Sequence, residues 1–232
     1  MTRQSLRAAV LASVAVSPLL GSVIHAQVPP TDLEIRAYSG LHAAAAAGDL
    51  AKLRAVIGQQ PDLEQRDGHG RTAVHVATHA GHQDALRDLA KAGADLKALD
   101  RDRYDAITIA AVRNDPAMVR LAIDLGGDPR AITSPYAGTA LIAAAHLGHA
   151  DVVRVLIAAK APLDHVNNLG WTATIEAVVL GDGGPQHQAT LLALVEAGAD
   201  VSLADRAGRT PLDAARSRGY TDMIRIIEGR RR

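Results

Sequence analysis

The chain has 232 residues, which suggests one or two domains, and its 25 Lys and Arg balance its 25 Asp and Glu. No bulk electrostatic field therefore draws it to nucleic acid or to an anionic membrane, and we expect it to bind neither. It contains no Cys and no Phe, one Trp and four Tyr. Disulfides, thiolate metal sites and a cysteine nucleophile are thus excluded, and the core must consist of Ala, Leu, Val and Ile.

The first 26 residues have the layout of a secretory signal peptide. Arg3 and Arg7 give a basic start, an apolar run follows, and Ala26 is a small residue placed before Gln27. We expect cleavage after Ala26 and a periplasmic or secreted mature protein that is not held in the membrane. A membrane anchor is the alternative, but a proline and a glycine interrupt the run, which is short for a bilayer.

After a linker at residues 27–33, the sequence repeats with a period of about 33 residues to its end. A repeat of this length predicts one domain of stacked units, because a single unit cannot bury its own apolar face. The predicted units are 34–66, 67–99, 100–133, 134–166, 167–204 and 205–232.

Two positions recur in phase in every unit. The first is an alanine, found at Ala44, Ala77, Ala110, Ala144, Ala177 and Ala215. The second, four residues later, is Gly48, Gly81, Asn114, Gly148, Gly181 and Gly219. Apolar residues at helical spacing follow, so each unit reads as a helix, a left-handed turn, a second helix and a loop. Asn is the residue that best replaces Gly in such a turn, so Asn114 fits the pattern.

These residues resemble the ankyrin repeat, whose pattern centres on T-P-L-H-x-A and G-A-D. Thr210-Pro211-Leu212 and Thr72-Ala73-Val74-His75 match it closely, and "GAD" occurs at 93–95 and 198–200. The resemblance covers residues 34–232 and implies an all-α solenoid of six stacked helix-turn-helix units with hairpin loops along one edge.

Three departures from the repeat are informative. Unit 5 carries five extra residues around "GDGGPQHQ" (181–188), which we expect to lie between its helices. Unit 4 carries one extra residue in "AITSPYAG" (131–138) and ends in "KAPLD" (160–164), where the usual glycine turn is missing.

The stretch "HVATHAGH" (75–82) raises the question of a metal site, because histidines four apart on a helix can share a zinc ion. Gly81 breaks the helix before His82, however, and no acid is placed as in H-E-x-x-H. In ankyrin repeats the residue at His75 typically bonds the backbone of the neighbouring loop. No nucleophile elbow, Walker loop or dinucleotide fingerprint occurs, and loop carboxylates such as Asp100 fit turn roles. We therefore predict no catalytic residue, no metal ligand and no cofactor.

The candidate partner-binding residues lie at two positions of each unit. The last residue of each hairpin is aromatic or basic in five units, and Tyr, Trp and Arg dominate interface hot spots. In ankyrin repeats the ends of the first helices join these loops on the concave face, where apolar residues would attract a partner. The predicted set is Tyr38, Arg71, His79, Tyr104, Arg113, His146, Leu147, Trp171, Leu180 and Arg209.

The sequence thus indicates a non-enzymatic, monomeric scaffold in the periplasm that binds a protein partner. Periplasmic proteins that resemble it are associated with oxidative-stress protection and with partner enzymes such as catalase. The alternative is a periplasmic protein that binds a small ligand or a metal through its surface histidines and the unit 5 insertion.

Overall fold

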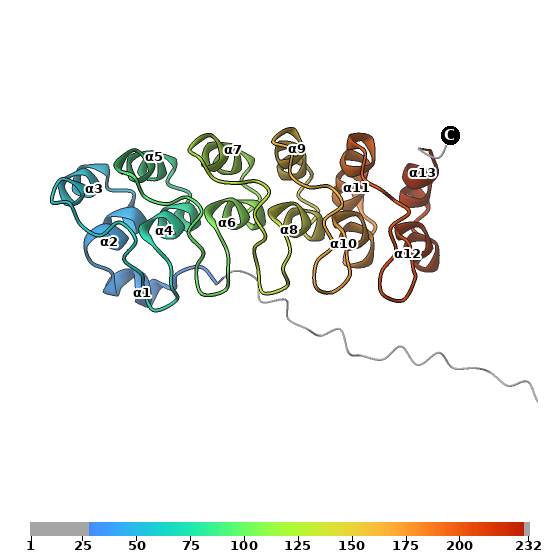
Figure 1. Ribbon diagram of the computed structural model, residues 1–232, viewed down its shortest axis with the longest axis horizontal. Coiled ribbons are helices and arrows are strands. Elements are labelled where there is room, and N and C mark those ends of the chain that lie inside the picture. The colour runs from blue at the N-terminus through green and yellow to red at the C-terminus, as the bar shows by residue number, and fades with distance from the viewer. Residues whose placement is uncertain (1–27, 230–232) are drawn as a thin grey trace, which may run out of the picture.

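The computed structural model describes residues 28–229, and the predicted signal peptide at 1–26 lies outside them. The described chain forms thirteen helices and a single isolated β-bridge, between Thr133 and Gly138. Figure 1 shows two rows of helices with hairpin loops projecting beneath them. This arrangement is the all-α solenoid that the sequence predicts.

The inner helices start each unit and form the row next to the hairpins (Figure 1). They are α2 (Gly40–Ala47), α4 (Ala73–Ala80), α6 (Ala106–Val112), α8 (Ala140–His146), α10 (Ala173–Val179) and α12 (Pro211–Arg218). The outer helices are α3 (Leu50–Ile57), α5 (Gln83–Ala92), α7 (Pro116–Asp124), α9 (Ala150–Ala158), α11 (Pro185–Ala197) and α13 (Thr221–Gly229). A polar residue occupies the N-cap position of each inner helix; the Thr139 hydroxyl, for example, accepts a hydrogen bond from the Ile142 N–H.

The core runs along the stack between neighbouring units. The alanine that recurs in all six inner helices is fully buried in each of them. Inner helices of adjacent units can approach closely only over a residue this small, and the leucines and valines of the outer helices fill the space behind them. This confirms the phase of the repeat.

The turn between the helices is left-handed in five units at the predicted residue. Gly48, Gly81, Gly148 and Gly219 have φ between 64° and 78°, and Asn114 has a φ of 55°. In unit 5 the prediction for Gly181 is wrong. The left-handed residue there is Gly183, with a φ of 73°. Gly181 is needed for space instead, because a Cβ on it would lie 2.2 Å from the Ala177 carbonyl oxygen.

The five extra residues of unit 5 lie partly in this turn and partly in a longer outer helix. Helix α11 starts at Pro185 and has 13 residues, against 8 to 10 in the other outer helices. The extension places His187 at its beginning. At the end of unit 4, Lys160 takes the left-handed conformation with a φ of 61°, where units 2, 3 and 5 use Gly93, Gly126 and Gly198.

Five hairpin loops connect the units, and each is closed by the same backbone hydrogen bond. The N–H of the first loop residue donates to the carbonyl of the last, over 2.8 to 3.0 Å, in loops 67–71, 100–104, 133–138, 167–171 and 205–209. An oxygen of the first or second loop residue accepts backbone N–H groups within the loop, as Asp100 Oδ1 does from Tyr104. Asp100 is therefore a turn residue, as predicted.

A helix outside the repeat pattern precedes unit 1. The sequence predicts a linker at 27–33, but Thr31 caps α1 (Asp32–Ala37) through a capping box with Glu34. This short helix decides which part of the concave face is open.

Candidate functional site

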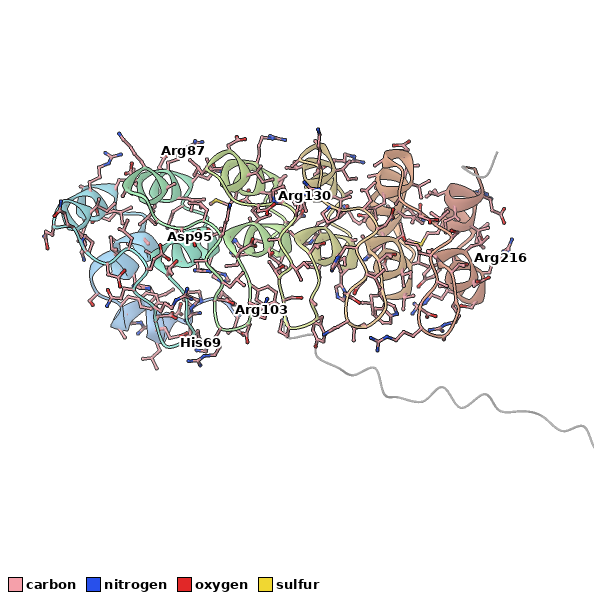
Figure 2. The ribbon with its side chains drawn as sticks, viewed as in Figure 1. His69, Arg87, Asp95, Arg103, Arg130 and Arg216 are labelled. Carbon is pink, nitrogen blue, oxygen red and sulfur yellow. The ribbon has the colours of Figure 1, made fainter. Side chains whose placement is uncertain are left out.

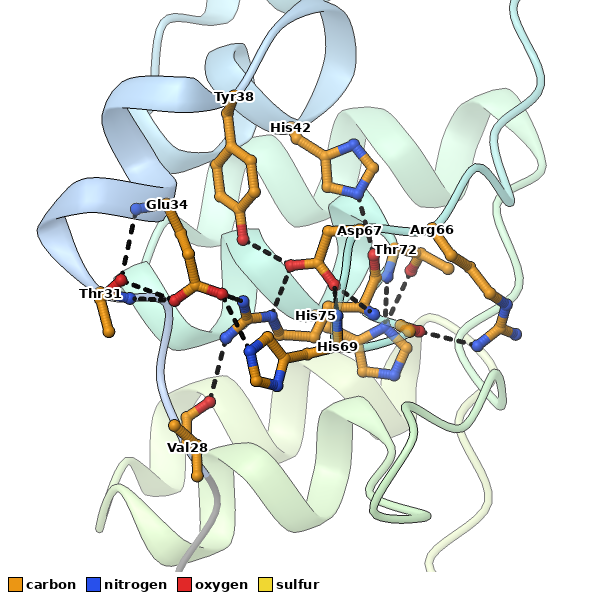
Figure 3. A network of polar contacts seen from close by, with 12 residues as sticks. Val28, Thr31, Glu34, Tyr38, His42, Arg66, Asp67, His69, Thr72 and His75 are labelled. Carbon is orange, nitrogen blue, oxygen red and sulfur yellow. Dashed lines mark hydrogen bonds and ion pairs between the residues drawn. The ribbon is translucent and has the colours of Figure 1, made fainter.

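The N-terminal segment 28–37 is bound to the unit 2 hairpin through Arg71. The guanidinium donates to Asp67 Oδ2 at 2.6 Å, to Glu34 Oε1 at 2.5 Å and to the Val28 carbonyl at 3.1 Å. Figure 3 shows this cluster, with Tyr38 above it donating its hydroxyl to Asp67 at 2.6 Å. We call these five residues the N-terminal clamp.

The clamp is electrostatically satisfied. Burial works to raise the pKa of Asp67, but hydrogen bonds from the Tyr38 hydroxyl and from Arg71 outweigh it and lower the pKa to about 2. Burial also raises the pKa of Tyr38 well above its ordinary value. The arginine side chain is 1 % exposed. This burial argues against the prediction that Arg71 contacts a partner. Its side chain holds the N-terminal segment in place.

The same segment covers the concave face of units 1 and 2. Pro29, Pro30 and Ile35 face His79 and the end of α2 across a gap of only about 80 Å³. His79 is 7 % exposed, and burial lowers its pKa to about 3, with the Arg71 charge adding to the effect. Its Nε2 has no hydrogen-bond partner among residues 28–229. His79 is a neutral, covered side chain, which corrects its assignment as a partner contact.

A second cavity lies further along the concave side, between units 3 and 5. It measures about 140 Å³ and opens to solvent. Its walls come from the inner helices α6, α8 and α10 and from the hairpins of units 3, 4 and 5. The lining residues are Tyr104, Val112, Ser134, Tyr136, Gly138, Thr139, Ile142, Ala143, His146, Leu147, Asn167, Leu169 and Glu176. We call this cavity the central pocket.

The central pocket exists because unit 4 has small residues where the adjacent units 3 and 5 have large ones. Gly138 ends the unit 4 hairpin at the position that Tyr104 and Trp171 occupy in the adjacent units. Ala143 stands on α8 where α6 has Ile109. Both small residues line the pocket, so the missing side chains leave the volume.

One end of the central pocket is polar. His146 Nδ1 lies 2.9 Å from Glu176 Oε2, and Asn167 Nδ2 donates to Glu176 Oε1 at 3.0 Å. Glu176 and Asn167 are each 5 % exposed, so the carboxylate is buried with both oxygens bonded. Of these three bonded residues, His146 is the one that reaches the solvent, with 22 % of its side chain exposed.

The predicted partner residues therefore separate into groups. Tyr104, His146 and Leu147 line the central pocket. Tyr104 does so as a buried wall residue, 5 % exposed, which corrects its assignment as an exposed edge aromatic. Burial raises its pKa to about 12, and Asp102 adds to the rise.

The other predicted residues lie outside the central pocket. Trp171 and Leu180 are partly exposed, and Arg113 is exposed at the end of α6 with its guanidinium directed toward Gly81 of unit 2. Arg209 is paired with Asp205 at 2.8 Å on the unit 6 hairpin, with 61 % of its side chain exposed.

Tyr136, Leu169 and Glu176 line the central pocket but are absent from the predicted set. The extra residue in the unit 4 loop moves Tyr136 out of the repeat register. Glu176 occupies the inner-helix position where units 3 and 4 have Ile109 and Ala143, and an acid among apolar residues at that position was the signal available.

Five further histidines of the described chain form structural contacts. His42 bonds the Arg71 carbonyl at 2.9 Å and His75 bonds those of Ala98 and Tyr104, as the resemblance implies. The other three bond inner-helix carbonyls of the preceding unit: His82 to Ala46, His149 to Ala111 and His187 to His146. Tyr220 makes the equivalent contact in unit 6, with the Gly181 carbonyl of the unit 5 turn. No three His, Asp or Glu side chains within 28–229 are grouped to hold a metal ion.

No helix between residues 28 and 229 is both long and apolar enough to cross a membrane.

The chain is similar to known proteins both in sequence and in fold. The family model described as "Ankyrin repeats (3 copies)" matches residues 41–133 and 107–205. The ankyrin repeat protein YahD of Escherichia coli (strain K12) is 31% identical over 185 residues, 79% of this chain and 92% of that protein. An ankyrin repeat domain from Acinetobacter baumannii AYE is 40% identical, with a TM-score of 0.77 over 82% of this chain and 96% of that one. The ankyrin repeat protein EF0377 is 29% identical with a TM-score of 0.76, over 82% and 98%.

Proposed function

Since the chain belongs to the ankyrin-repeat family, whose repeats indicate a protein–protein interaction scaffold, we propose that it binds a protein partner through the concave face of units 3 to 5. The fold indicates a non-catalytic interaction domain. The observation that carries the placement is the contrast between the two halves of the concave face. The N-terminal segment covers units 1 and 2, while an apolar pocket lies open on units 3 to 5.

The exposed apolar residues around the central pocket support this proposal. Leu147 at the end of α8 is 39 % exposed, and Leu169 on the unit 5 hairpin is 38 % exposed. Trp171 follows on the same hairpin and is partly exposed. Apolar side chains grouped beside a pocket lose contact with water when a partner docks, which is the main favourable term in association.

The proposal is tested by recovering partners with tagged protein. Leu147→Asp should lose the partner that the wild-type chain retains, because a charge would be buried in the interface. Leu192→Asp is the matched control, since Leu192 is 40 % exposed on α11, on the outer row of helices. Equal recovery by both variants would place the interface elsewhere, and loss by both would indicate a general effect on the chain.

The proposed location is the periplasm, with the signal peptide removed after Ala26. The basic start, the apolar run and the small residue before Gln27 support this location. Mass spectrometry of the soluble periplasmic fraction should find a chain that begins at Gln27. Recovery of the intact N-terminus in the membrane fraction would mean that the segment is an anchor.

A finer form of the proposal is that the monomeric scaffold supports an enzyme of oxidative-stress protection. It rests on resemblance to periplasmic ankyrin proteins associated with such enzymes. A strain that lacks the protein should then lose viability in hydrogen peroxide, and the wild-type chain but not Leu147→Asp should restore it. Unchanged peroxide survival in the deletion strain would remove this form of the proposal and leave the scaffold intact.

The alternative function, binding of a small ligand, is favoured by one observation, the volume of the central pocket. Equilibrium dialysis with zinc, copper and haem separates it from the scaffold. Saturable binding of any of the three at one site per chain would favour the alternative.

A further inference from the structure

We propose that the central pocket binds a tyrosine side chain presented by an acidic segment of the partner, an inference that rests on the proposed scaffold function. Three properties of the central pocket favour this occupant: its size, its hydrogen-bonding groups and the charge around it.

Size favours a single aromatic ring. The central pocket measures about 140 Å³. An engineered apolar cavity of about 150 Å³ is known to hold benzene, so one six-membered ring fills a space of this kind. The walls suit a ring, because Val112, Ile142, Ala143, Leu147 and Leu169 offer aliphatic surface. The aromatic side chains of Tyr104 and Tyr136 also line the pocket.

The polar end favours a ring that carries a hydroxyl group. Glu176 already accepts from Asn167 and pairs with His146 Nδ1, so Nδ1 carries the proton toward the carboxylate. The other ring nitrogen, Nε2, can bond a hydroxyl group in either form of the ring, as an acceptor when neutral or as a donor when charged, and no hydrogen bond uses this atom among the described residues. A phenol is apolar along its ring and donates at its tip, which matches this pocket better than a phenylalanine or a leucine does.

The charge around the pocket favours acidic flanks. Arg103 directly precedes Tyr104 of the pocket wall. It is exposed and forms no ion pair within residues 28–229. Figure 2 shows Arg103 on the hairpin edge of the stack. On the opposite side of the pocket, Arg206 Nη2 donates to the Asn168 carbonyl at 2.6 Å, beside Leu169.

Among the described residues, these two arginines lack a carboxylate partner of their own. The unit 3 hairpin carries two acids, Asp100 and Asp102, beside Arg101 and Arg103, and Asp100 is bonded to the Tyr104 N–H. A partner segment with Asp or Glu on both sides of its tyrosine would meet an arginine on each side. These charges would orient the segment in the complex and raise the rate of association.

The test uses the purified protein and three acetylated, amidated nonapeptides, followed by NMR titration of backbone amides. One peptide has a central tyrosine with acidic flanks, the second has alanine in place of the tyrosine, and the third keeps the tyrosine between lysines. The tyrosine peptide with acidic flanks should bind at least roughly tenfold more tightly than the alanine peptide, because burial of one aromatic ring alone exceeds that factor. It should also bind more tightly than the lysine peptide, whose charge the arginines repel. Its affinity should fall with added salt, and the amides of Ala143, Leu147 and Leu169 should shift most.

Two variants check that the peptide is in the pocket. Ala143→Leu should reduce the affinity of the tyrosine peptide to that of the alanine peptide. Ala47→Leu is the matched control, since Ala47 is exposed at the end of α2 and should leave binding unchanged. Leu169→Asp, at an exposed hairpin position, gives a second block should Ala143→Leu lower the melting temperature.

The proposal is overturned if the three peptides bind alike, if none shifts the pocket amides at millimolar concentration, or if Leu169→Asp binds the tyrosine peptide as the wild type does. The partner recovered by the wild-type chain separates this outcome from failure of the scaffold. A partner that binds Ala143→Leu normally refutes the tyrosine pocket alone, whereas recovery of no partner refutes the scaffold itself.

Discussion

Replacement of Arg71 by alanine should destabilise the protein strongly, although the repeat pattern places this residue on a partner-binding edge. The side chain is 1 % exposed and donates to Asp67, Glu34 and the Val28 carbonyl. Removal of one partner from a buried ion pair costs about 3–5 kcal/mol, because the other charge is left uncompensated. Asp67 keeps its bonds from Tyr38 and from the loop backbone, and Glu34 is 27 % exposed, so we expect the lower end, about 3 kcal/mol.

Arg209→Ala is the matched control for this prediction. Arg209 occupies the same position of unit 6 and pairs with an aspartate four residues earlier, but 61 % of its side chain is exposed. Asp205 is 4 % exposed but keeps hydrogen bonds from the Ala207 and Arg209 N–H groups, so loss of the exposed arginine should cost about 1 kcal/mol. Urea denaturation of both variants measures the difference. Equal losses of about 1 kcal/mol or less would refute the account of the N-terminal clamp, and with it the covering of units 1 and 2.

Three further predictions concern the turns, the edge aromatics and pH. Lys160→Gly should raise the melting temperature, because Lys160 holds a left-handed conformation that costs roughly 1 kcal/mol for a residue with a Cβ; Lys160→Ala should give no such gain. Tyr104→Ala should cost about 3 kcal/mol of unfolding free energy by opening a buried space, and Trp171→Ala about 1 kcal/mol; equal costs in denaturation would contradict the burial seen here. His75 and His79 have pKa values lowered by burial to about 4 and about 3, so they stay neutral in the fold and protonate on unfolding. Stability should be complete above pH 6.5 and fall as the pH drops, by roughly 2 kcal/mol for each histidine at pH 5, and a denaturation midpoint unchanged between pH 7 and pH 5 would contradict their burial.

The repeating part of the fold could be predicted from the sequence because it follows from local rules. An alanine at every inner-helix contact and a Gly or Asn at each turn fix the phase of the stack, and Ala110 and Asn114 show this even in unit 3, where the T-P-L-H motif is weak. The same reasoning failed at Gly181, because an insertion allows the turn to form two residues later.

The candidate site was harder to predict because it arises where units differ. Arg71 and Arg209 share a repeat position and a neighbouring aspartate, but only Arg71 is covered by a segment outside the repeat. The central pocket depends on the absence of side chains at Gly138 and Ala143, and a missing side chain leaves no positive signal in a sequence. Its buried carboxylate, Glu176, stands at a position where the other inner helices have Ala, Val or Ile.

The central claim is that the partner docks on the concave side of units 3 to 5 and not on units 1 and 2. Hydrogen–deuterium exchange of the protein alone and in the complex tests it most directly. We predict that the partner slows exchange in residues 136–147 and 167–180, while the α2 and α4 amides exchange as in the free protein. Slower exchange confined to α2 and α4, or to the outer helices, would contradict the claim.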